Sequence, residues 1–352
     1  MEQQTNLAEI LELMSQPGFC VTENCITLVN QAAKAMLLTP GQDVLPLLHT
    51  GAEEYAQFQN GQLCLTLCIA GKLHNATVIQ MDNTNLFLLD SEEQTEEFRS
   101  MALISMELRS PLMQVMQNAE QLLSTLDPQD LTAAKMNKGL LQLMRMVCNL
   151  SDVSRYHESA FMQTRDICAF LEEILEKAQV LTADTGIQLS WDLPREAIPC
   201  LIDSEQMERA VWNLISNAIK FTPKGGCVQA KLTRHNKRLQ FQITDSGSGI
   251  AEAIRSSVFQ RYLRQPGIED SRFGLGLGMV IVRTCAANHG GTVLIDQGSN
   301  SGTRITMTFT LRQAAETTVS SPMLYPDYCS GWDHGLLELS DCLPAEEFTN
   351  LF

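Results

Sequence analysis

The spacing of apolar and polar residues divides the 352-residue chain into four regions. In the first, residues 1–90, short apolar runs such as Phe19–Val21 and Leu63–Ile69 alternate with turn signals, among them Asn60-Gly61 and Ala70-Gly71. Apolar runs of this length, bounded by pairs that contain glycine, are typical of antiparallel strands. The pattern predicts a small mixed α/β domain over residues 1–90.

Residues 91–158 instead follow a seven-residue repeat of apolar positions, interrupted at residues 125–128 by a break that contains proline. Such a repeat is typical of the seam of a helical bundle, and it predicts two amphipathic helices in an antiparallel hairpin. Because one hairpin leaves its stripe exposed, we expect two chains to form a four-helix bundle, a homodimer through residues 91–158. The repeat comprises Met101, Leu108, Val115 and Leu122 before the break, and Met136, Leu143 and Leu150 after it.

Residues 160–312 alternate between helical and strand patterns. This alternation predicts a two-layer α/β sandwich, with helices on one side of a mixed sheet. Together with the first two regions it makes the chain an α+β protein of several domains. The expected helices cover 166–183, 204–221 and 279–288, and the expected strands cover 187–193, 227–233, 239–245, 292–296 and 304–311.

Residues 313–352 form an acidic C-terminal tail that contains no Lys or Arg. Its charge favours an unstructured tail, whereas its scattered apolar residues favour one that docks on its own domain or on a partner. The sequence leaves both interpretations open. The apolar residues are Leu324, Trp332, Leu336, Leu337 and Phe352.

Composition narrows the possible functions. Apolar residues make up 44% of the chain and charged residues 19%, which is typical of a folded globular protein. The net charge of -16 argues against a nucleic-acid partner, because phosphate neutralisation needs clustered Lys and Arg. The sequence has neither an apolar stretch long enough to span a membrane nor a basic N-terminal leader, and its 11 cysteines include no CxxC pair. We therefore expect a cytoplasmic protein with reduced thiols.

The first cluster with recognisable chemistry lies in the expected helix 204–221. Asn213 and Asn217 are four residues apart and Lys220 follows three further on, so the three side chains share one helix face. An amide oxygen can ligate Mg²⁺, and a lysine can contact a phosphate. A surface face of this composition is also common without any function.

Two glycine-rich segments follow. Asp245, at a strand end, precedes Gly247 and Gly249, and its carboxylate can accept a hydrogen bond from an exocyclic amine while the glycines allow close backbone approach. Gly274 and Gly276 precede a helix whose N-terminus favours phosphate. The Asp245 segment alone also fits a tight turn with an Asp cap, and a glycine-rich loop alone is weak evidence for a phosphate site.

In this order and spacing, the three clusters resemble the N, G1 and G2 boxes of the ATPase superfamily that includes gyrase, ninety-kilodalton heat-shock chaperones, mismatch-repair MutL and histidine kinases. Residues 258–262 are similar to the F box of the kinase branch, and residues 289–303 to its closing strands. The resemblance covers residues 166–311. One departure is Arg272-Phe273-Gly274, where the family often has Gly-Thr-Gly.

The resemblance implies a site for ATP and Mg²⁺. Asn217 would ligate Mg²⁺, and Asn213 would support the phosphates or the metal-bound water. Asp245 would bind adenine, flanked by glycines. The remaining implied roles are phosphate contact by Lys220, close approach at Gly247, Gly249, Gly274 and Gly276, support of Asp245 by Thr303, and positive charge in the lid from Arg261, Arg264 or Arg272.

The first hairpin helix contains ISMELRSPL at residues 104–112, which resembles the H box of histidine kinases. The family usually has Ser-His-Glu-Leu-Arg-Thr-or-Ser-Pro-Leu, so Met106 occupies the position of the phosphoaccepting histidine. A thioether is neither an adequate nucleophile nor a proton donor for phosphoryl transfer. The heptad count points Ser105 toward the dimer seam, and Pro111 is expected to bend the helix. Phosphorylation of the protein's own H box is therefore not expected.

Glu107 and Ser110 lie three residues apart on the same helix. In the family, an acid and a hydroxyl or amide at these places help to orient water against a phosphorylated response regulator, which would leave a phosphatase. Both residues also fit a purely structural role. Residues 18–33 are similar to a PAS sensor domain, so the resemblance implies a PAS-like sensor over residues 1–90.

These observations favour a two-component histidine-kinase homologue that binds ATP and Mg²⁺ as a regulatory pseudokinase, with a response regulator or partner kinase as its partner. The first alternative is an active enzyme, either a response-regulator phosphatase or a kinase acting on a partner's histidine. A second is a chaperone-type or repair-type ATPase. It is disfavoured because those proteins have a catalytic Glu at the position of Asn213 and lack the H-box hairpin.

Overall fold

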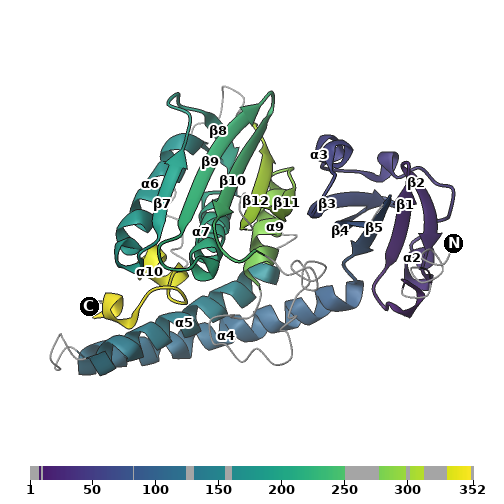
Figure 1. Cartoon of the computed structure of the whole chain (residues 1–352). Coiled ribbons are helices and arrows are strands. Elements are labelled where there is room, and N and C mark those ends of the chain that lie inside the picture. The colour runs from purple at the N-terminus through teal and green to yellow at the C-terminus, as the bar shows by residue number, and fades with distance from the viewer. Residues whose placement is uncertain are drawn as a thin grey trace.

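The computed structural model describes residues 8, 11–81, 83–123, 131–154, 161–249, 277–298, 302–312 and 331–349. The N-terminal strands lie on one side of the molecule and an α/β unit lies on the other, with two long helices beneath (Figure 1). The α+β class expected from the sequence is confirmed.

Five antiparallel strands form the N-terminal part, in the order β2-β1-β5-β4-β3. The turn between β3 and β4 is the pair Ala70-Gly71, where both residues have positive φ, 49° and 79°. This backbone matches the twist of a two-residue hairpin. Phe19 stacks on Phe87 in the core with ring centroids 4.8 Å apart. The elements are β1 Gly18–Thr22, β2 Cys25–Val29, α2 Gln31–Ala35, α3 Ala52–Gln57, β3 Gln62–Ile69, β4 Lys72–Met81 and β5 Thr84–Leu89.

The C-terminal α/β unit continues with strands in the order β11-β12-β10-β9-β7, of which β7 and β9 are parallel. Along β10, buried and half-exposed residues alternate because one face of the sheet packs on the helices. The elements are α6 Ile167–Leu181, β7 Gln188–Asp192, α7 Ser204–Phe221, β9 Cys227–His235, β10 Arg238–Asp245, α9 Gly278–Asn288, β11 Val293–Gln297 and β12 Thr303–Thr310. A two-stranded sheet of β6 Gln163–Asp166 and β8 Pro199–Ile202 was not predicted.

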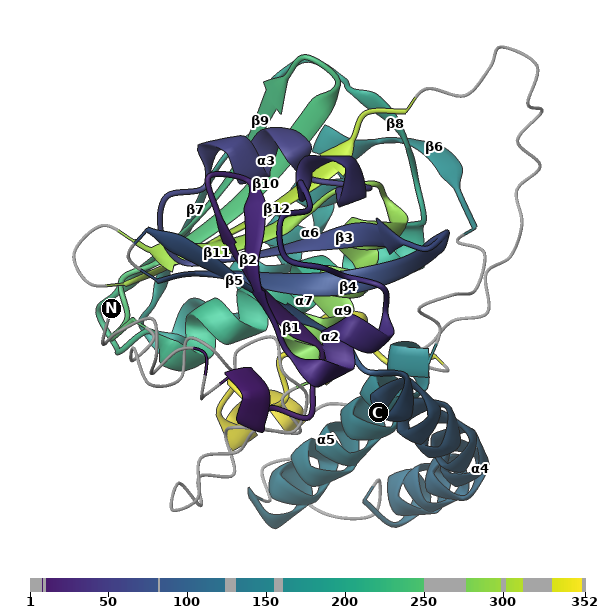
Figure 2. The same cartoon turned by 90° about the vertical axis from the view of Figure 1, so that its right-hand side faces the viewer.

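The two parts share a single ten-stranded sheet, whereas the sequence pattern predicted separate domains. Strand β3 pairs antiparallel with β11, so that Cys64 lies opposite Val293 and Gln62 opposite Ile295. Seen from its side, the molecule has the N-terminal strands in front of the C-terminal ones, and α4 and α5 side by side below (Figure 2). The N-terminal part is therefore joined to the α/β unit by backbone hydrogen bonds.

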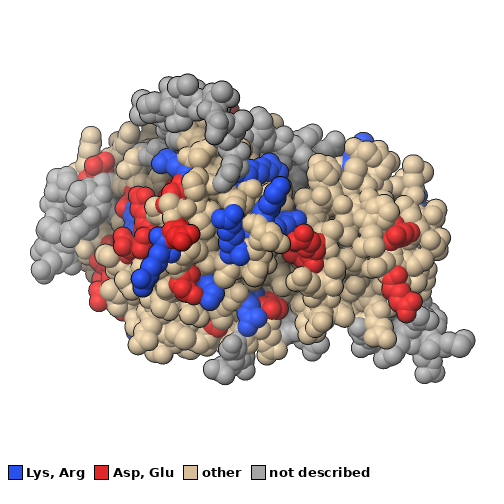
Figure 3. Space-filling view, turned by 90° about the horizontal axis from the view of Figure 1, so that it is seen from above, with Lys and Arg blue, Asp and Glu red and all other residues tan. Residues whose placement is uncertain are grey.

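Two ion pairs cross the same junction. Arg283 on α9 donates to both oxygens of Asp90, at 2.6 and 3.2 Å, and its side chain is 4% exposed. Arg238 on β10 lies 3.3 Å from Glu54 on α3. Seen from above, Lys and Arg side chains gather toward the middle of the molecule with Asp and Glu side chains around them (Figure 3). Charge complementarity thus reinforces the shared sheet.

The long helices are α4, Glu92–Leu123, and α5, Leu131–Ser154, and they pack along each other. Helix α4 continues through Pro111. Ser105 is fully buried, donates to the carbonyl of Ala102 and lies 2.8 Å from the Ser151 hydroxyl. Ser105 therefore faces α5 of its own chain, rather than the dimer seam that the heptad count predicted. No helix in the described ranges combines the length and hydrophobicity that a bilayer span requires.

The C-terminal segment, residues 331–349, is folded onto the rest of the chain. It contains α10, His334–Glu338, and a 3-10 helix, Ala345–Phe348, and it packs against α5, α6 and α7. Leu337, Leu343 and Phe348 are almost completely buried there. The expectation of an unstructured tail is wrong for these residues, because their apolar side chains pack against α5, α6 and α7.

We predict that Asp90→Ala lowers the free energy of unfolding by about 3 kcal/mol, because it leaves the buried Arg283 guanidinium without its bidentate carboxylate. The control is Asp192→Ala, which breaks the exposed pair with Lys231 and should cost less than about 1 kcal/mol. Urea unfolding of both variants measures the difference. Equal losses would show that the Arg283 pair contributes no more than a surface pair.

Candidate functional site

Helix α7 carries the first cluster of predicted site residues. Its N-terminus is capped by Asp203, whose carboxylate accepts from the backbone N–H of Gln206 at 3.1 Å. Asn213 is 1% exposed and donates its amide to the carbonyl of Arg209, which fixes the side chain along the helix. Asn217 and Lys220 are half-buried. The polar face of α7 therefore becomes more exposed to solvent from Asn213 toward the carboxyl end of the helix.

The start of α9 lies directly against this face. A Cβ added at Gly278 would be 2.6 Å from Oδ1 of Asn213, so a larger residue here would displace the Asn213 amide. The Asn217 amide nitrogen lies 3.4 Å from the sulfur of Met279. The N-terminus of α9, which is the positive end of the helix dipole, is thereby held beside the two asparagines. Gly274, Gly276 and Arg261 lie outside the described residues.

Asp245 ends strand β10 and forms the second part of the site. It is 7% exposed, and its Oδ1 accepts from the backbone N–H of Gly247 at 2.8 Å and of Thr303 at 3.2 Å. Burial raises the pKa of this carboxyl, and these hydrogen bonds oppose the shift. The carboxylate is therefore fixed in direction and sparsely hydrated, which suits recognition of a polar ligand group.

Close backbone contacts join the two parts. A Cβ at Gly247 would overlap the carbonyl oxygen of Phe221, the last residue of α7, and would lie 2.9 Å from Oδ1 of Asp245. A Cβ at Gly302 would overlap the Asp245 carbonyl. Gly249 has a φ of 71°, which favours glycine. The end of α7, the loop after β10 and the start of β12 consequently form one compact unit.

The described groups suit a nucleotide with a bound divalent cation. Asn213 and Asn217 offer amide oxygens, Lys220 offers positive charge, and Asp245 offers an acceptor at the other end. The described ranges hold no cluster of three or more His, Cys, Asp or Glu side chains that could bind a metal by themselves. Mg²⁺ commonly relies on few protein ligands together with phosphates, so this donor set fits a metal that arrives with the nucleotide.

Arg145 is a neighbour that sequence reasoning missed. It comes from α5, and its Nη2 lies 3.1 Å from the hydroxyl of Ser216 and 3.5 Å from Oδ1 of Asn213. Its position in the sequence gave no signal, because an arginine in an amphipathic helix normally faces solvent.

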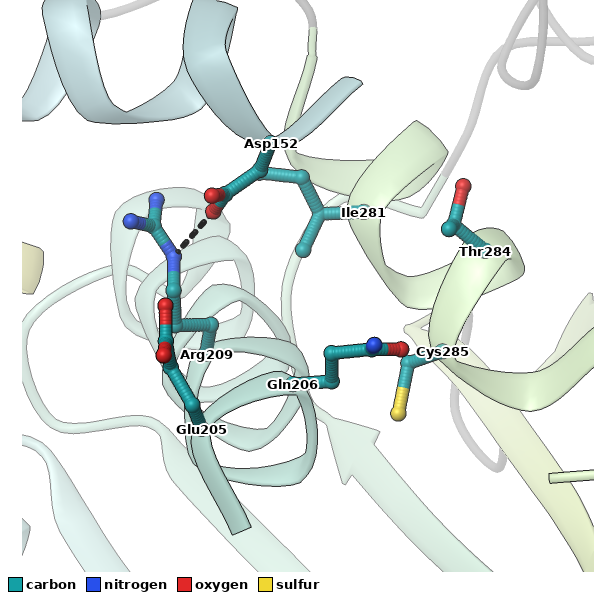
Figure 4. A pocket seen from close by; sticks show the side chains of 7 residues that line it. All are labelled: Asp152, Glu205, Gln206, Arg209, Ile281, Thr284 and Cys285. Atoms are coloured by element: carbon teal, nitrogen blue, oxygen red, sulfur yellow. Dashed lines mark ion pairs between the residues drawn. The ribbon is translucent and has the colours of Figure 1, made fainter. Parts of the chain in front are cut away.

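A small pocket between α7 and α9 lies apart from the predicted site residues. Its volume of about 30 Å³ suits water rather than a nucleotide. Figure 4 shows Arg209 pointing at Asp152 across it, with Nε and Oδ2 2.7 Å apart. The lining residues are Asp152, Glu205, Gln206, Arg209, Ile281, Thr284 and Cys285.

Helix α4 presents the residues of the H-box resemblance to solvent. Met106 is 64% exposed, and Glu107 and Ser110 are exposed beside it. Ser105, the preceding residue, is buried against α5. The four side chains are thus divided between the inner and outer faces of one helix.

Part of the chain matches a known protein family. Residues 202–313 match the family described as histidine kinase-, DNA gyrase B-, and HSP90-like ATPase. Hybrid signal transduction histidine kinase D of Dictyostelium discoideum is 28% identical over 252 residues, which are 67% of this chain and 16% of that protein. Sensor-like histidine kinase SenX3 of Mycobacterium tuberculosis is 30% identical over 213 residues, 58% of this chain and 52% of that protein.

The crystal structure of full-length ShkA in complex with AMPPNP aligns with a TM-score of 0.51 at 24% identity, covering 61% of this chain and 47% of that one. This likeness shows a shared fold. The chain spans about half, or less, of the length of these three proteins.

The fold and the site therefore define an ATPase domain of the histidine kinase, gyrase and HSP90 type. Among these branches, the chain is most clearly similar to proteins named as histidine kinases, including SenX3 and hybrid signal transduction histidine kinase D.

We predict that Gly247→Ala lowers the free energy of unfolding by about 1 to 3 kcal/mol, because the new methyl group overlaps the Phe221 carbonyl. It should also weaken binding of a fluorescent ATP analogue by displacing Asp245. The matched control is Gly139→Ala in α5, where an added Cβ meets nothing within 4 Å and should stabilise the helix slightly. Unchanged stability and binding in Gly247→Ala would refute the close packing of this loop.

Proposed function

We propose that the chain is a two-component signalling protein that binds ATP with Mg²⁺ and acts as a regulatory pseudokinase. The observation that carries this proposal is the side chain of Met106. It is exposed on α4 at the position where the family has its phosphoaccepting histidine, in a chain whose residues 202–313 match the ATPase family. A thioether cannot accept a phosphoryl group, so ATP binding would serve conformation or partner binding.

Three features support ATP binding. The ShkA structure that shares this fold contains AMPPNP, an ATP analogue. Asp245 is held by Gly247 and Thr303 in a direction suited to the adenine amine. Asn213, Asn217 and Lys220 line α7 next to the N-terminus of α9, where the phosphates would lie. We assign Asn217 as the Mg²⁺ ligand, and Mg²⁺ would neutralise phosphate charge.

The division of labour in the chain is also a proposal. Residues 1–90 would be a PAS-like sensor, 91–158 a dimerisation hairpin, 160–312 the ATPase domain and 313–352 an acidic regulatory tail. The pairing of β3 with β11 favours direct coupling of the sensor to the ATPase domain, since a change in either strand alters the other's hydrogen bonds.

Homodimerisation is supported by the hairpin surface. The outward heptad series on α4 stays exposed, from 36% at Met101 to 67% at Leu122, although its members are apolar. Contiguous exposed apolar residues favour association with another surface. On α5, Met136 and Leu143 are 44% and 49% exposed. A second copy of the hairpin would bury these stripes in a four-helix bundle.

The second candidate function is an enzyme. Glu107 and Ser110 are both exposed on α4 beside Met106, which favours a phosphatase acting on a phosphorylated response regulator. A kinase acting in trans would use the same ATPase domain on the histidine of a partner kinase. The two enzymes differ in their need for ATP.

For the pseudokinase, we predict that purified wild-type protein incubated with γ-labelled ATP acquires no label, whereas Met106→His acquires it. Histidine restores a nucleophile at the exposed position. The control is Met106→Gln, which changes polarity without supplying the imidazole. Label on the wild type would contradict the pseudokinase, and failure of all three proteins to bind ATP would contradict the nucleotide site.

For the phosphatase, we predict that the wild type speeds loss of phosphate from a phosphorylated response regulator and that Glu107→Ala lowers this rate by roughly 10²-fold, a typical loss for a group that orients a nucleophile. The control is Glu120→Ala, which removes a half-buried acid nearer the carboxyl end of α4. Equal rates with and without the wild-type protein would exclude this candidate.

A further inference from the structure

The C-terminal segment, residues 331–349, lies between two parts of the molecule that it holds together. On one side is helix α5 of the hairpin, and on the other are α6 and α7 of the ATPase domain (Figure 1). Its apolar side chains join the ATPase core, and α10 packs so closely that a Cβ at Gly335 would be 2.5 Å from Leu181 and 3.1 Å from Trp212. The segment therefore fills a groove shaped for it.

Buried charges mark the centre of this groove. Glu338, whose side chain is fully buried, lies between Arg145 of α5 and Arg209 of α7, at 3.1 and 3.6 Å. Asp341 lies 2.7 Å from the other side of the Arg145 guanidinium. Buried cations need paired anions, and the segment brings acids without a Lys or Arg of its own. The groove is thus specific for an acidic segment.

Helix α5 also binds the backbone of the segment. Lys138 donates to the carbonyl of Leu343 at 2.7 Å, and Asn137 donates to that of Phe348 at 3.0 Å. Gln142 reaches both the Ser340 carbonyl and the Asp341 carboxylate. These contacts span two turns of α5 on one face, so docking of the segment fixes α5 against the ATPase domain.

The same network ends at the nucleotide site. Arg145, held by Glu338 and Asp341, directs Nη2 toward the Ser216 hydroxyl and toward Oδ1 of Asn213. Cys342 adds contacts to the hydroxyl and carbonyl of Ser216 at 3.2 and 3.3 Å. The guanidinium thus engages the Asn213 amide oxygen, which the proposed site would use to hold the metal-bound water.

We propose that residues 331–349 act as an autoinhibitory clamp, an inference that rests on the proposed nucleotide site. When docked, the segment holds the hairpin on the ATPase domain and keeps Arg145 against Asn213, which weakens binding of ATP with Mg²⁺. When the segment is undocked, the hairpin can move away from the ATPase domain and Arg145 can move away from Asn213. Residues 313–330 keep the released segment attached, so redocking is intramolecular and needs no high affinity.

The test uses the full-length chain with the double substitution Glu338→Gln and Asp341→Asn. The first readout is alkylation of Cys342, mapped by mass spectrometry and normalised to the exposed Cys227, because burial raises the pKa of the Cys342 thiol and undocking removes that burial. The second is the Kd for ATP with Mg²⁺, measured by calorimetry. The control is Glu346→Gln, which removes one negative charge at an exposed site of the segment.

We expect the double variant to show roughly tenfold faster Cys342 labelling and roughly threefold to tenfold tighter ATP binding, the scale of losing charge-assisted hydrogen bonds. Glu346→Gln should match the wild type. Should the double variant fail to fold, as judged by circular dichroism, Lys138→Met takes its place, since it removes one contact to the segment and leaves the buried charges paired. A smaller change in the same direction is then expected.

Unchanged labelling, or faster labelling with unchanged or weaker ATP binding, overturns the clamp. If no form of the protein binds ATP, the proposed nucleotide site fails, and hydrogen exchange of the α7 amides around Asn213 and Ser216 decides the clamp separately. Faster exchange there in the double variant, but not in Glu346→Gln, supports it. Equal exchange rates in the three proteins reject it.

Discussion

Helix α7 packs against four neighbours at once, and the rest of the structure depends on this packing. It is buried on more than one side, since Trp212 and Leu214, which point in different directions, are both fully buried. Another side contacts the start of α9 at Gly278, which has no side chain and so lets the two helices approach closely. Its carboxyl end touches the loop after β10 at Gly247, and its outer side receives Arg145. A helix packed so completely cannot shift at one surface without disturbing the others.

This packing links parts of the molecule that are distant in the sequence. The hairpin contacts Asn213 through Arg145, and the loop after β10 contacts the end of α7 through Gly247. The shared sheet provides a second connection, because β3 and β11 belong to the two halves and are neighbours in one ladder. Both connections are short-range contacts between rigid elements, which is the kind of coupling that can have two discrete arrangements.

Chemistry and packing diverge on helix α4. The residues around Met106 keep the amphipathic character of the helix, with Ser105 and Ala102 inside and Glu107 and Ser110 outside. Methionine at position 106 costs nothing in packing because the side chain is largely exposed. Methionine therefore changes the chemical reactivity of the helix surface, whereas the packing of the helix stays the same. Structure alone would give no reason to notice this position; the resemblance of residues 104–112 to the H box does.

The sequence by itself determined the regular elements and the local chemistry. The expected helix 204–221 coincides with α7, because its caps and apolar periodicity are both local, and the clusters around Asn213 and Asp245 were visible because a few neighbouring residues define each one. The short strands β6 and β8 were missed, since four residues carry too little pattern. Only the tertiary structure decided that β3 joins β11, that Ser105 faces α5 and that the acidic segment docks between Arg145 and Arg209. Each of these depends on surfaces that meet across long sequence separations, where pairing is set by shape, charge and backbone edges that no local pattern records.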